Sequence, residues 1–364
     1  MSVISAFRDP AVAGSLLGSI EGLADGLSRP VTFMEVCGTH TMAIYQNGIR
    51  AMLPDAIRLI SGPGCPVCVT PVGYVDHAVA LARREDTVVT TFGDMMRVPG
   101  STSSLTEEKA RGADVRIVYS PLDAVSLASR TPEKTVVFLG VGFETTTPAV
   151  AGAIVTARRE SLDNFYVLGS HKTMPRPMAA LSADPELQIG GYICPAHVST
   201  IIGAEGYRPL ADRHGVPCVI TGFEPVDILQ GVEMMVRQAA AGTAEVQNQY
   251  SRYVKWGGNV KARDLLYEVF EPCDARWRGI GDIPGSGLRI RDAYAACDAS
   301  VHLPVSVEEA QEPPGCRCGD VLKGKVTPKE CSLFRTVCSP LDPVGACMVS
   351  SEGTCAAEYK YGTT

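Results

Sequence analysis

Clustered cysteines are the side chains of this 364-residue sequence best suited to metal or redox chemistry. Six of the thirteen cysteines lie in the last 50 residues, and four of them are separated by 12, 6 and 16 residues: Cys318, Cys331, Cys338 and Cys355. Four thiolates satisfy an iron–sulfur cluster or a structural zinc ion. The tail has no Cys-x-x-Cys pair of the kind that favours zinc, and prolines lie between the cysteines, so the spacing favours a cluster held by loops.

The first ligand of this predicted cluster is open, because the tail holds two spare cysteines, Cys316 and Cys347. Cys316 could replace Cys318, which would change the first spacing to 14 residues. We favour Cys318 because Gly319 follows it and allows the backbone to turn toward a cluster. Reduced buried thiols and a structural zinc ion are the alternative interpretations of the tail.

A second thiol motif, Cys65-Pro66-Val67-Cys68, lies on a glycine-rich loop and precedes a helix that we expect to begin near Val72. A helix N-terminus stabilises a thiolate and lowers its pKa, and two thiols at this spacing can form a disulfide. The motif therefore indicates a redox-active pair formed by Cys65 and Cys68. A structural turn with incidental cysteines and half of a zinc site are the alternatives.

Cys37 and His40 form a third candidate site, in which a soft ligand and a borderline ligand are three residues apart. They could bind a metal, or act as a nucleophile and its base. A buried cysteine beside a loop histidine is the plain alternative. Position favours a functional role, because Cys37 and Cys65 each follow an apolar run typical of a buried strand, and ligands of open α/β sheets bind outside the carboxyl ends of strands. We expect His40 to reach the same cavity, either as a hydrogen-bond donor to a metal ligand or as a proton relay.

An α/β framework must position these motifs. Short apolar runs bounded by glycine and proline predict buried parallel strands at residues 31–36, 57–61, 87–91, 115–119, 135–140, 165–168, 189–193 and 217–220. Helices between them are predicted at residues 41–51, 72–84, 103–111, 149–159, 176–183 and 201–213. This alternation is typical of parallel sheets built from βαβ units.

Strands recur at similar intervals in two halves of the chain, which predicts two similar Rossmann-like parallel-sheet domains that face each other across a cleft. The predicted domains are residues 31–130, residues 131–228, and a helical and loop-rich domain made of residues 1–30 and 229–364. The first domain would carry the thiols of Cys37, Cys65 and Cys68. The third domain would hold the cluster, which is expected to stabilise a tail poor in regular structure.

Composition narrows the possible functions. The net charge is −7 and no basic stripe is present, which argues against nucleic acid as the main partner. No apolar run reaches the roughly 18 residues that a membrane span needs, and no cationic leader precedes a long apolar core. Neither a G-x-G-x-x-G nor a Walker A sequence occurs, so no nucleotide site is predicted. These features predict a soluble cytoplasmic protein.

In order along the chain, the motifs resemble those of the hydrogenase maturation factor HypD family over nearly the whole length of the sequence. The resemblance rests on these segments: FMEVCGTHT, GPGCPVCVTP, TFGDMMRVPGS, GFETTTP, CPAHVS, GFEP, WRGIG and, in the tail, CGDVLKG, CSLF and MVSSEGTCAAEYKY. Several unusual motifs in one order make the resemblance specific.

The resemblance implies a scaffold with redox activity, rather than a simple turnover enzyme, on which the iron of [NiFe]-hydrogenases receives two cyanide ligands and one carbon monoxide. It implies the small chaperone HypC as the partner that helps to hold this iron, and HypE, working with HypF, as the cyanide donor. Cys37 would be an iron ligand shared with the chaperone, and Cys65 and Cys68 would be a redox pair. The tail would carry a [4Fe–4S] cluster.

Physical chemistry is consistent with these expectations. A thiolate is a suitable soft anchor for low-spin iron(II) with cyanide and carbon monoxide, and a cluster beside a dithiol can deliver electrons singly or in pairs. The main alternative is a cluster-dependent thiol–disulfide reductase, in which Cys65 and Cys68 act on a partner's disulfide. A zinc-stabilised adaptor without catalytic chemistry is the third interpretation.

Overall fold

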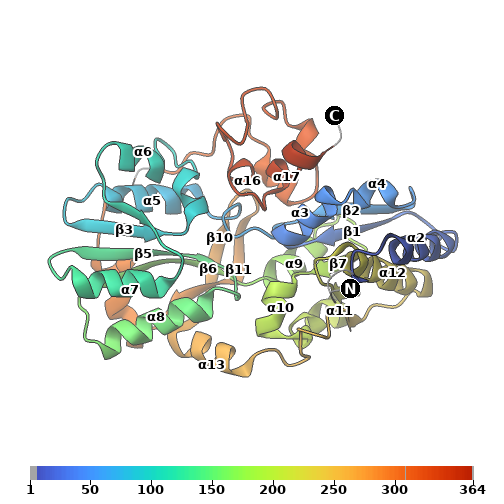
Figure 1. Cartoon of the computed structure of the whole chain (residues 1–364), viewed down its shortest axis with the longest axis horizontal. Helices are drawn as coiled ribbons and strands as arrows, with labels where there is room; N and C mark the ends of the chain where they lie inside the picture. The colour runs from blue at the N-terminus through green and yellow to red at the C-terminus, as the bar shows by residue number, and fades with distance from the viewer. Residues whose placement is uncertain (1–5, 308, 363–364) are drawn as a thin grey trace.

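Two sheets of mainly parallel strands form two lobes, and the C-terminal segment lies over the junction between them (Figure 1). The computed structural model describes residues 6–307 and 309–362. Both lobes are α/β units and the cysteine-rich tail is short of regular structure, so the fold class expected from the sequence is confirmed. No helix in the described part of the chain is long and apolar enough to cross a membrane.

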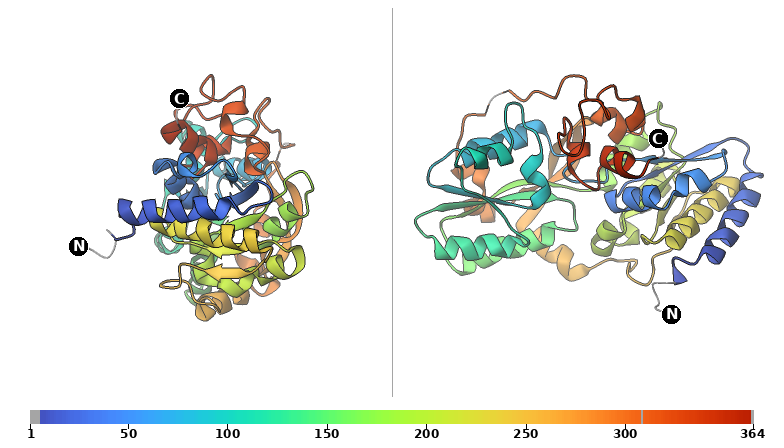
Figure 2. Two further views of the ribbon diagram at one scale, coloured as in Figure 1. Left: turned by 90° about the vertical axis from the view of Figure 1, so that its right-hand side faces the viewer. Right: turned by 45° about the horizontal axis from the view of Figure 1, so that its top comes forward.

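The five-stranded lobe is a parallel sheet with the strand order β2-β1-β7-β8-β9. Its strands are β1 (Val31–Glu35), β2 (Ile57–Ser61), β7 (Gly191–Cys194), β8 (Cys218–Ile220) and β9 (Val246–Asn248). Its helices are α2 (Pro10–Ala24), α3 (Gly38–Gln46), α4 (Ile49–Met52), α9 (Pro175–Ser182), α10 (Ala196–Ile202), η2 (Ala204–Tyr207), α11 (Arg208–His214) and α12 (Pro225–Ala241). One apolar core joins the sheet to α2, α3 and α12, and another joins it to α9, α10 and α11. Figure 2 shows α2 lying along α12 at the outer side of this lobe.

The six-stranded lobe has the strand order β10-β11-β6-β5-β3-β4. Four of its strands are parallel: β3 (Thr87–Thr91), β4 (Val115–Ile117), β5 (Thr135–Gly142) and β6 (Phe165–Lys172). An antiparallel hairpin of β10 (Phe270–Trp277) and β11 (Gly281–Ile290) extends the sheet beside β6. The helices are α5 (Val72–Ala82), η1 (Gly93–Arg97), α6 (Leu105–Ala110), α7 (Pro121–Arg130), α8 (Thr147–Arg159), α13 (Val260–Val269), η3 (Asp292–Cys297) and α14 (Ala299–His302). α7, α8 and α13 cover one face of the sheet, and α5, α6 and α14 cover the other.

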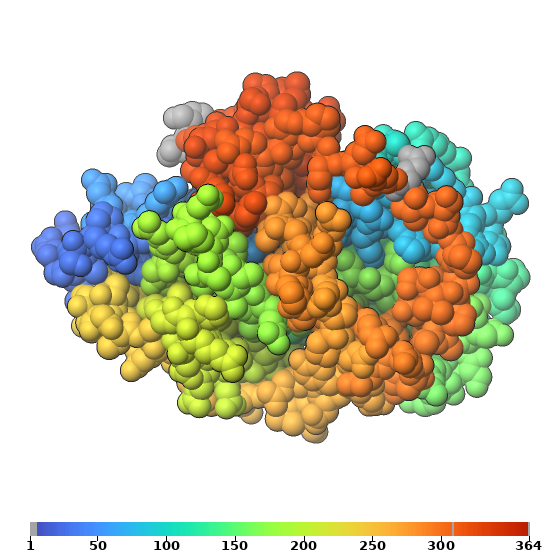
Figure 3. All heavy atoms as spheres, turned by 180° about the vertical axis from the view of Figure 1, so that it is seen from behind, coloured from blue at the N-terminus to red at the C-terminus, as the bar shows by residue number. Residues whose placement is uncertain are grey.

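The C-terminal segment contacts both lobes. Its helices are α15 (Cys318–Leu322), η4 (Pro328–Glu330), α16 (Ala346–Val349) and α17 (Thr354–Tyr361). α16 joins an apolar cluster with α5, η1 and β5 of the six-stranded lobe, whereas α17 contacts α3 of the five-stranded lobe. Seen from behind, the segment covers the upper side of the junction, and the hairpin of β10 and β11 lies exposed below it (Figure 3).

The strands that make up each sheet do not follow the domain boundaries predicted from the sequence. β1 and β2 pair with β7 to β9, whereas β3 to β6 pair with the hairpin, so the boundary expected at residue 130 falls inside the six-stranded lobe. Residues 229–290, expected in the third domain, add β9 to one sheet and the hairpin to the other. The spacing of strands along the sequence could not reveal this, because the pairing joins strands that are far apart in the chain.

This interleaving makes the chain cross from one lobe to the other. The first crossing, residues 62–71, runs from β2 of the five-stranded sheet to α5 of the six-stranded lobe. It contains both Cys65 and Cys68. The predicted dithiol therefore lies at the junction of the lobes rather than inside one domain.

Candidate functional site

The loops that follow β1 and β2 pack tightly against each other. The N–H of Gly38 donates to the carbonyl of Gly64 at 3.2 Å, and the N–H of Gly62 donates to the carbonyl of Glu35 at 2.8 Å. A Cβ atom on Gly64 would lie less than 2.5 Å from the backbone N and Cα of Cys37. Glycine is therefore required at this position, and it lets the dithiol loop approach Cys37 through its backbone.

His40 lies in the first turn of α3 and is fully buried. Its Nε2 atom is 2.9 Å from the hydroxyl oxygen of Thr221 and 3.3 Å and 3.0 Å from the carbonyl oxygens of Thr221 and Gly222; because carbonyls only accept, we assign the ring proton to this nitrogen. Burial lowers the pKa of His40 to about 4, which keeps the ring neutral. The Nδ1 atom has no hydrogen-bond partner among the described residues, so its lone pair is free.

Aromatic rings connect His40 with the surface. The ring of Phe223 lies 4.7 Å from that of His40 and 4.4 Å from that of His197, measured between ring centroids. His197 is exposed and follows β7, while Phe223 follows β8. Three motifs that are distant in the sequence, CGTH, CPAH and GFEP, thus meet at the carboxyl edge of the five-stranded sheet, where α/β proteins bind ligands.

The C-terminal segment covers one side of Cys37. Thr39 Oγ1 donates to Glu352 Oε1 at 2.7 Å, and a Cβ on Gly38 would lie 2.5 Å from the Cβ of Glu352. Burial raises the pKa of the Cys37 thiol to about 12, and the Glu352 carboxylate adds to this, whereas the N–H groups of His40 and Thr39 favour the thiolate. A metal that binds Cys37 must therefore displace a proton from sulfur.

Cys65 and Cys68 lie at one end of a continuous row of thiols. The N–H of Cys68 points at the Sγ atom of Cys65 at 3.3 Å, as expected for a tight Cys-x-x-Cys turn. Burial raises the pKa of the Cys68 thiol, which also interacts with the thiol of Cys347. Cys347 in turn interacts with the thiols of Cys318 and Cys355. The row therefore leads from the crossing between the lobes into the tail.

This row ends in a cavity of the C-terminal segment that six cysteines line. They are Cys316, Cys318, Cys331, Cys338, Cys347 and Cys355. The rest of the wall is mostly apolar and includes Val321, Leu333, Phe334 and Met348. No three ligating side chains of residues 6–307 and 309–362 converge closely enough to hold a single ion, whereas a cluster distributes its thiolates over several iron atoms. The four expected cluster cysteines and both spare ones thus surround one space.

Arg278, in the turn between β10 and β11, lies between the dithiol loop and this cavity. Its N–H donates to the carbonyl of Val69 at 2.9 Å. The next residue, Gly279, packs so closely on Gly319 that neither has room for a Cβ atom. The WRGIG motif therefore brings the hairpin turn against both thiol-bearing segments.

The guanidinium of Arg278 has unused donors. Its Nε atom pairs with Glu312 at 3.1 Å, but Nη1 and Nη2 are buried without an acceptor among the described residues. The Cys318 thiol and burial raise the pKa of Cys316, and the positive charge of Arg278 opposes this rise. Buried donors are almost always paired, and Arg278 lines a neighbouring cavity with Glu309, Ala310 and Glu312 rather than the six-cysteine cavity itself.

A loop of the six-stranded lobe holds the tail over the junction. Arg97 donates to the carbonyls of Pro340 at 2.8 Å and Val349 at 3.3 Å. Ser350 donates to the carboxylate of Asp94 at 2.8 Å. The TFGDMMRVPGS motif is therefore explained by its contacts with the cysteine-rich segment.

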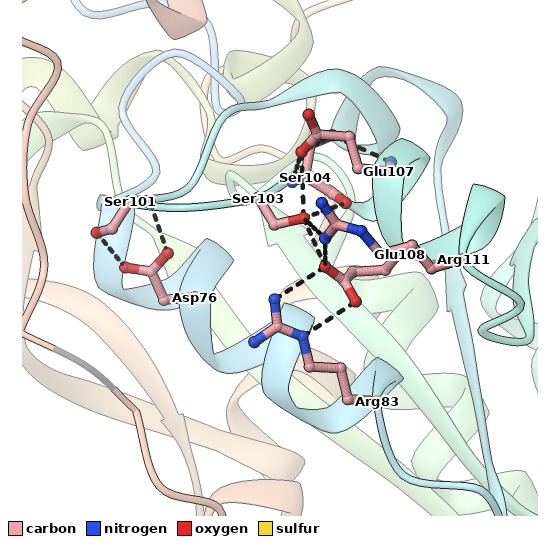
Figure 4. A network of polar contacts seen from close by, with 8 residues as sticks. All are labelled: Asp76, Arg83, Ser101, Ser103, Ser104, Glu107, Glu108 and Arg111. Atoms are coloured by element: carbon pink, nitrogen blue, oxygen red, sulfur yellow. Dashed lines mark hydrogen bonds and ion pairs between the residues drawn. The ribbon is translucent and has the colours of Figure 1, made fainter.

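A network of polar contacts fixes this loop on α5 and α6 (Figure 4). The carboxylate of Asp76 accepts from the N–H and the hydroxyl of Ser101, both at 2.7 Å. Glu108 is buried and accepts from Arg83 at 2.9 Å and 3.0 Å and from Arg111 at 2.6 Å. The hydrogen bonds from Arg83 contribute most to lowering the pKa of Glu108, to about 2, so the ion pairs persist across the physiological range.

His171 and Glu144 are buried residues at or just after the ends of β6 and β5. His171, one of the strand-end histidines, lies on the six-stranded sheet against Phe270 at 5.1 Å between ring centroids, away from His40. Glu144, in the GFETTTP motif, is buried, accepts from the N–H of Met174 at 3.1 Å, and has a pKa raised by burial to about 7. Arg278, Glu144 and Glu352 were not predicted as site residues, although each belongs to a motif that stands out in the sequence.

The fold and the site define a two-lobed α/β protein. The buried thiol of Cys37 lies at the carboxyl edge of the five-stranded sheet, and a row of thiols leads from Cys65 and Cys68 to the cysteine-lined cavity of the C-terminal segment. Residues 11–362 match the family described as HypD, Hydrogenase formation hypA family, and the chain belongs to this family. "Hydrogenase maturation factor HypD" of Rhodobacter capsulatus is 48% identical over 100% of this chain and 98% of the relative. The proteins of that name from Azotobacter vinelandii and Escherichia coli (strain K12) are 47% and 43% identical, over 100% and 99% of this chain and 97% and 98% of the relatives.

Proposed function

We propose that the chain is a maturation scaffold for [NiFe]-hydrogenases that, with the chaperone HypC, holds and assembles the Fe(CN)2CO moiety by means of a redox dithiol and a [4Fe–4S] cluster. Relatives that match the whole chain are named hydrogenase maturation factors. The observation that carries the proposal is the row of thiols that begins at Cys65 and Cys68, beside the backbone of Cys37, and ends in the six-cysteine cavity.

Cys37 is proposed as the anchor of the iron under assembly, which is the substrate of the scaffold. A thiolate suits iron(II) with strong-field ligands, and the N–H groups of Thr39 and His40 at the start of α3 stabilise that thiolate. Because His40 stays neutral, its free Nδ1 is proposed to accept a hydrogen bond from a group bound at the iron. The exposed side of the site at His197 gives a partner's cysteine access to the same iron.

The proposed redox step runs through the chain's own thiols. If Cys65 and Cys68 form a disulfide, the thiolate of Cys347 can attack the sulfur of Cys68, and Cys318 can then attack the mixed disulfide. The products are a disulfide between Cys318 and Cys347 and a reduced pair, Cys65 and Cys68. Two electrons and two protons have then moved to the dithiol beside Cys37, and the reverse exchange would remove them.

A [4Fe–4S] cluster in the cavity would supply electrons one at a time when bound. Cys331, Cys338 and Cys355 are proposed as three of its ligands. Cys316 and Cys318 both line the cavity, and because the proposed exchange uses Cys318, we propose Cys316, the alternative left open by the sequence, as the fourth ligand. The six cysteines and the apolar wall of the cavity support a cluster at this place, and the positive charge of Arg278 acts on Cys316.

The proposed partners follow from the family and from the open edge of the five-stranded sheet. HypC would share the iron at Cys37, and HypE, working with HypF, would deliver cyanide to it. We expect this assembly in the cytoplasm. The competing function, a cluster-dependent thiol–disulfide reductase, uses the same row of thiols but needs no iron at Cys37.

The test is anaerobic purification of the chain with HypC, followed by infrared spectroscopy. The wild-type complex should show cyanide and carbon monoxide stretches, and Cys37→Ala should abolish them while iron and sulfide of the tail cluster stay unchanged. Cys297→Ala, a buried cysteine of the six-stranded lobe outside the row of thiols, is the matched control and should keep the bands. Bands at full strength in the Cys37→Ala complex would overturn the assignment of the anchor, and their absence from the wild type would favour the reductase.

A further inference from the structure

A second polar cavity lies on the six-stranded lobe, outside the row of thiols. Its volume is about 260 Å³, and it opens between β6, the hairpin of β10 and β11, and the ends of α5 and α14. Pro71, on its rim, is three residues from Cys68, so the cavity borders the end of the dithiol loop. None of the chemistry proposed above uses it.

An unpaired cation lines this cavity. Lys172, the last residue of β6, is 3% exposed, and its Nζ atom donates to the hydroxyl of Ser170 at 3.0 Å. It also lies 5.8 Å from the ring centre of Trp277. No carboxylate of the described residues lies within ion-pair distance of this ammonium, which is an unfavourable state for a buried charge. Burial lowers the pKa of Lys172 to about 8, so the group is still mostly charged at neutral pH.

The register of the sheet brings a thiol to the same place. Cys273 of β10 pairs with Gly287 of β11, and Gly287 pairs with Lys172 of β6, so the three residues form one row across the sheet. A Cβ on Gly287 would lie 3.0 Å from the Sγ atom of Cys273. Without that Cβ, the thiol lies over β11, in the same row of the sheet as Lys172.

The other charged groups of the cavity already have partners. Asp274 accepts from the N–H of Gly285 at 2.9 Å, and Asp298 accepts from the N–H of Ser300 at 2.9 Å at the start of α14. Arg289 forms an ion pair with Asp292 at 3.4 Å. Arg276 pairs with Asp282 at 3.9 Å, so Lys172 is the cation of the cavity lining that is left without a carboxylate partner among the described residues.

We infer that this cavity binds a small oxyanion, a phosphate or a carboxylate, with its oxygens on the ammonium of Lys172. The hydroxyl of Ser170 and the thiol of Cys273 are further donors within the same cavity. An ammonium–oxyanion pair in a partly dehydrated pocket forms a charge-assisted hydrogen bond, and it removes the cost of the unpaired charge. The inference does not depend on the function proposed above, because it uses neither a cluster nor an iron.

Calorimetric titration of the full-length protein with inorganic phosphate and with acetate tests the inference. The wild type should bind at least one of the two, and the stronger ligand identifies the class. Lys172→Met, which keeps the length of the side chain, should weaken binding by at least about tenfold, the effect of one charge-assisted hydrogen bond. Lys261→Met, which removes an exposed ammonium outside the cavity, should bind as the wild type does. Equal binding by the wild type and Lys172→Met would overturn the inference.

A second measurement needs no variant at a buried position. The bound anion should shield Cys273, so alkylation of the Cys273 peptide in the wild type should slow as the anion is added. The same labelling with added chloride at matched ionic strength serves as the reference. No protection of Cys273 and no heat of binding at about 10 mM of either anion, well above a millimolar dissociation constant, would also overturn the inference.

Discussion

Replacing Gly64 by alanine should separate the two loops that carry Cys37 and the dithiol. A Cβ at Gly64 would lie less than 2.5 Å from three backbone atoms, the N and Cα of Cys37 and the carbonyl carbon of Val36, whereas ordinary contact begins at 3.4 Å. No flexible side chain can absorb this overlap, so the loops must move apart by about 1 Å in a closely packed region. We expect a loss of about 3 kcal/mol in the free energy of unfolding, at the upper end of the usual cost of overpacking.

The assay combines urea unfolding with the rate at which iodoacetamide labels Cys37, read by mass spectrometry. Gly64→Ala should lower the unfolding midpoint and speed the labelling, because the displaced loop uncovers a thiol that is 5% exposed. Gly22→Ala is the control. It lies within α2, where a Cβ meets no atom within 4 Å, and should stabilise by about 0.5–1 kcal/mol through helix propensity.

Unchanged stability and unchanged labelling of Cys37 in Gly64→Ala would refute the close approach of the two loops. A loss of stability without faster labelling would mean that the strain is relieved on the side of Val36 instead. In both cases the argument that connects the dithiol loop to Cys37 through their backbones would fail.

Further predictions concern the tail, the hairpin turn, the dithiol and a buried acid. Cys331→Ala should remove the roughly four iron and four sulfide expected per anaerobically purified chain, and a colourless wild type with one zinc would contradict this. Arg278→Gln should keep the iron content but lower the reduction potential of the cluster, because a cation near the sulfurs stabilises the reduced state. Potentiometric titration with electron paramagnetic resonance measures this potential. An unchanged potential would show that the two free donors do not face the cluster. Cys65 and Cys68 should interconvert between dithiol and disulfide with the redox buffer, as differential alkylation would show, and a pair that never reacts would be structural. The pKa of Glu144 is raised from 4.5 to about 7, so its protonated form stabilises the fold at low pH and this stability, about 3 kcal/mol, is lost as the pH rises through 7. Glu144→Gln should therefore flatten the dependence of unfolding free energy on pH between 5 and 8, and an unchanged slope would contradict the assignment.

Buried parallel strands could be predicted well from the sequence because their apolar runs are continuous. Six of the eight predicted strands, such as Val31–Glu35 and Thr135–Gly142, begin at the predicted residue. The other two, β7 and β8, begin two residues and one residue later than predicted. A strand that is covered on both faces needs apolar side chains throughout, and such a run ends visibly at glycine or proline.

The hairpin of β10 and β11 could not be recognised in the same way. β10 alternates between half-buried and exposed positions between its two buried ends, and β11 contains Pro284 and three glycines, so neither strand shows a continuous apolar run. The pairing of β11 with β6 is antiparallel and joins residues more than 100 positions apart. Only the three-dimensional structure therefore shows that the hairpin turn brings Arg278 to the thiols.

The candidate site could be predicted in its parts but not in its connections. The sequence placed Cys37, Cys65 and Cys68 at strand ends, and it grouped the tail cysteines by their spacing. The role of Cys347 depends on a contact with Cys68 across 279 residues, to which local spacing gives no clue. The preference for Cys318 over Cys316 as a cluster ligand rested on the neighbouring Gly319, which packs against Gly279; both thiols line the cavity, so this choice stays a prediction.

Under the proposed function, the interleaved topology would explain how the dithiol acts on the site of Cys37. If the two domains followed each other along the chain, the loop after β2 would lie inside one domain and would contact only the sheet of that domain. Here residues 62–71 cross between the lobes, so this segment contacts Cys37 through Gly64, the tail through Cys347 and the hairpin turn through Val69. A change between dithiol and disulfide alters the covalent structure of residues 62–71, the segment that contacts Cys37, the tail and the hairpin turn. Electrons that reach Cys68 through Cys347 would therefore arrive next to the iron anchor without any large movement of the lobes.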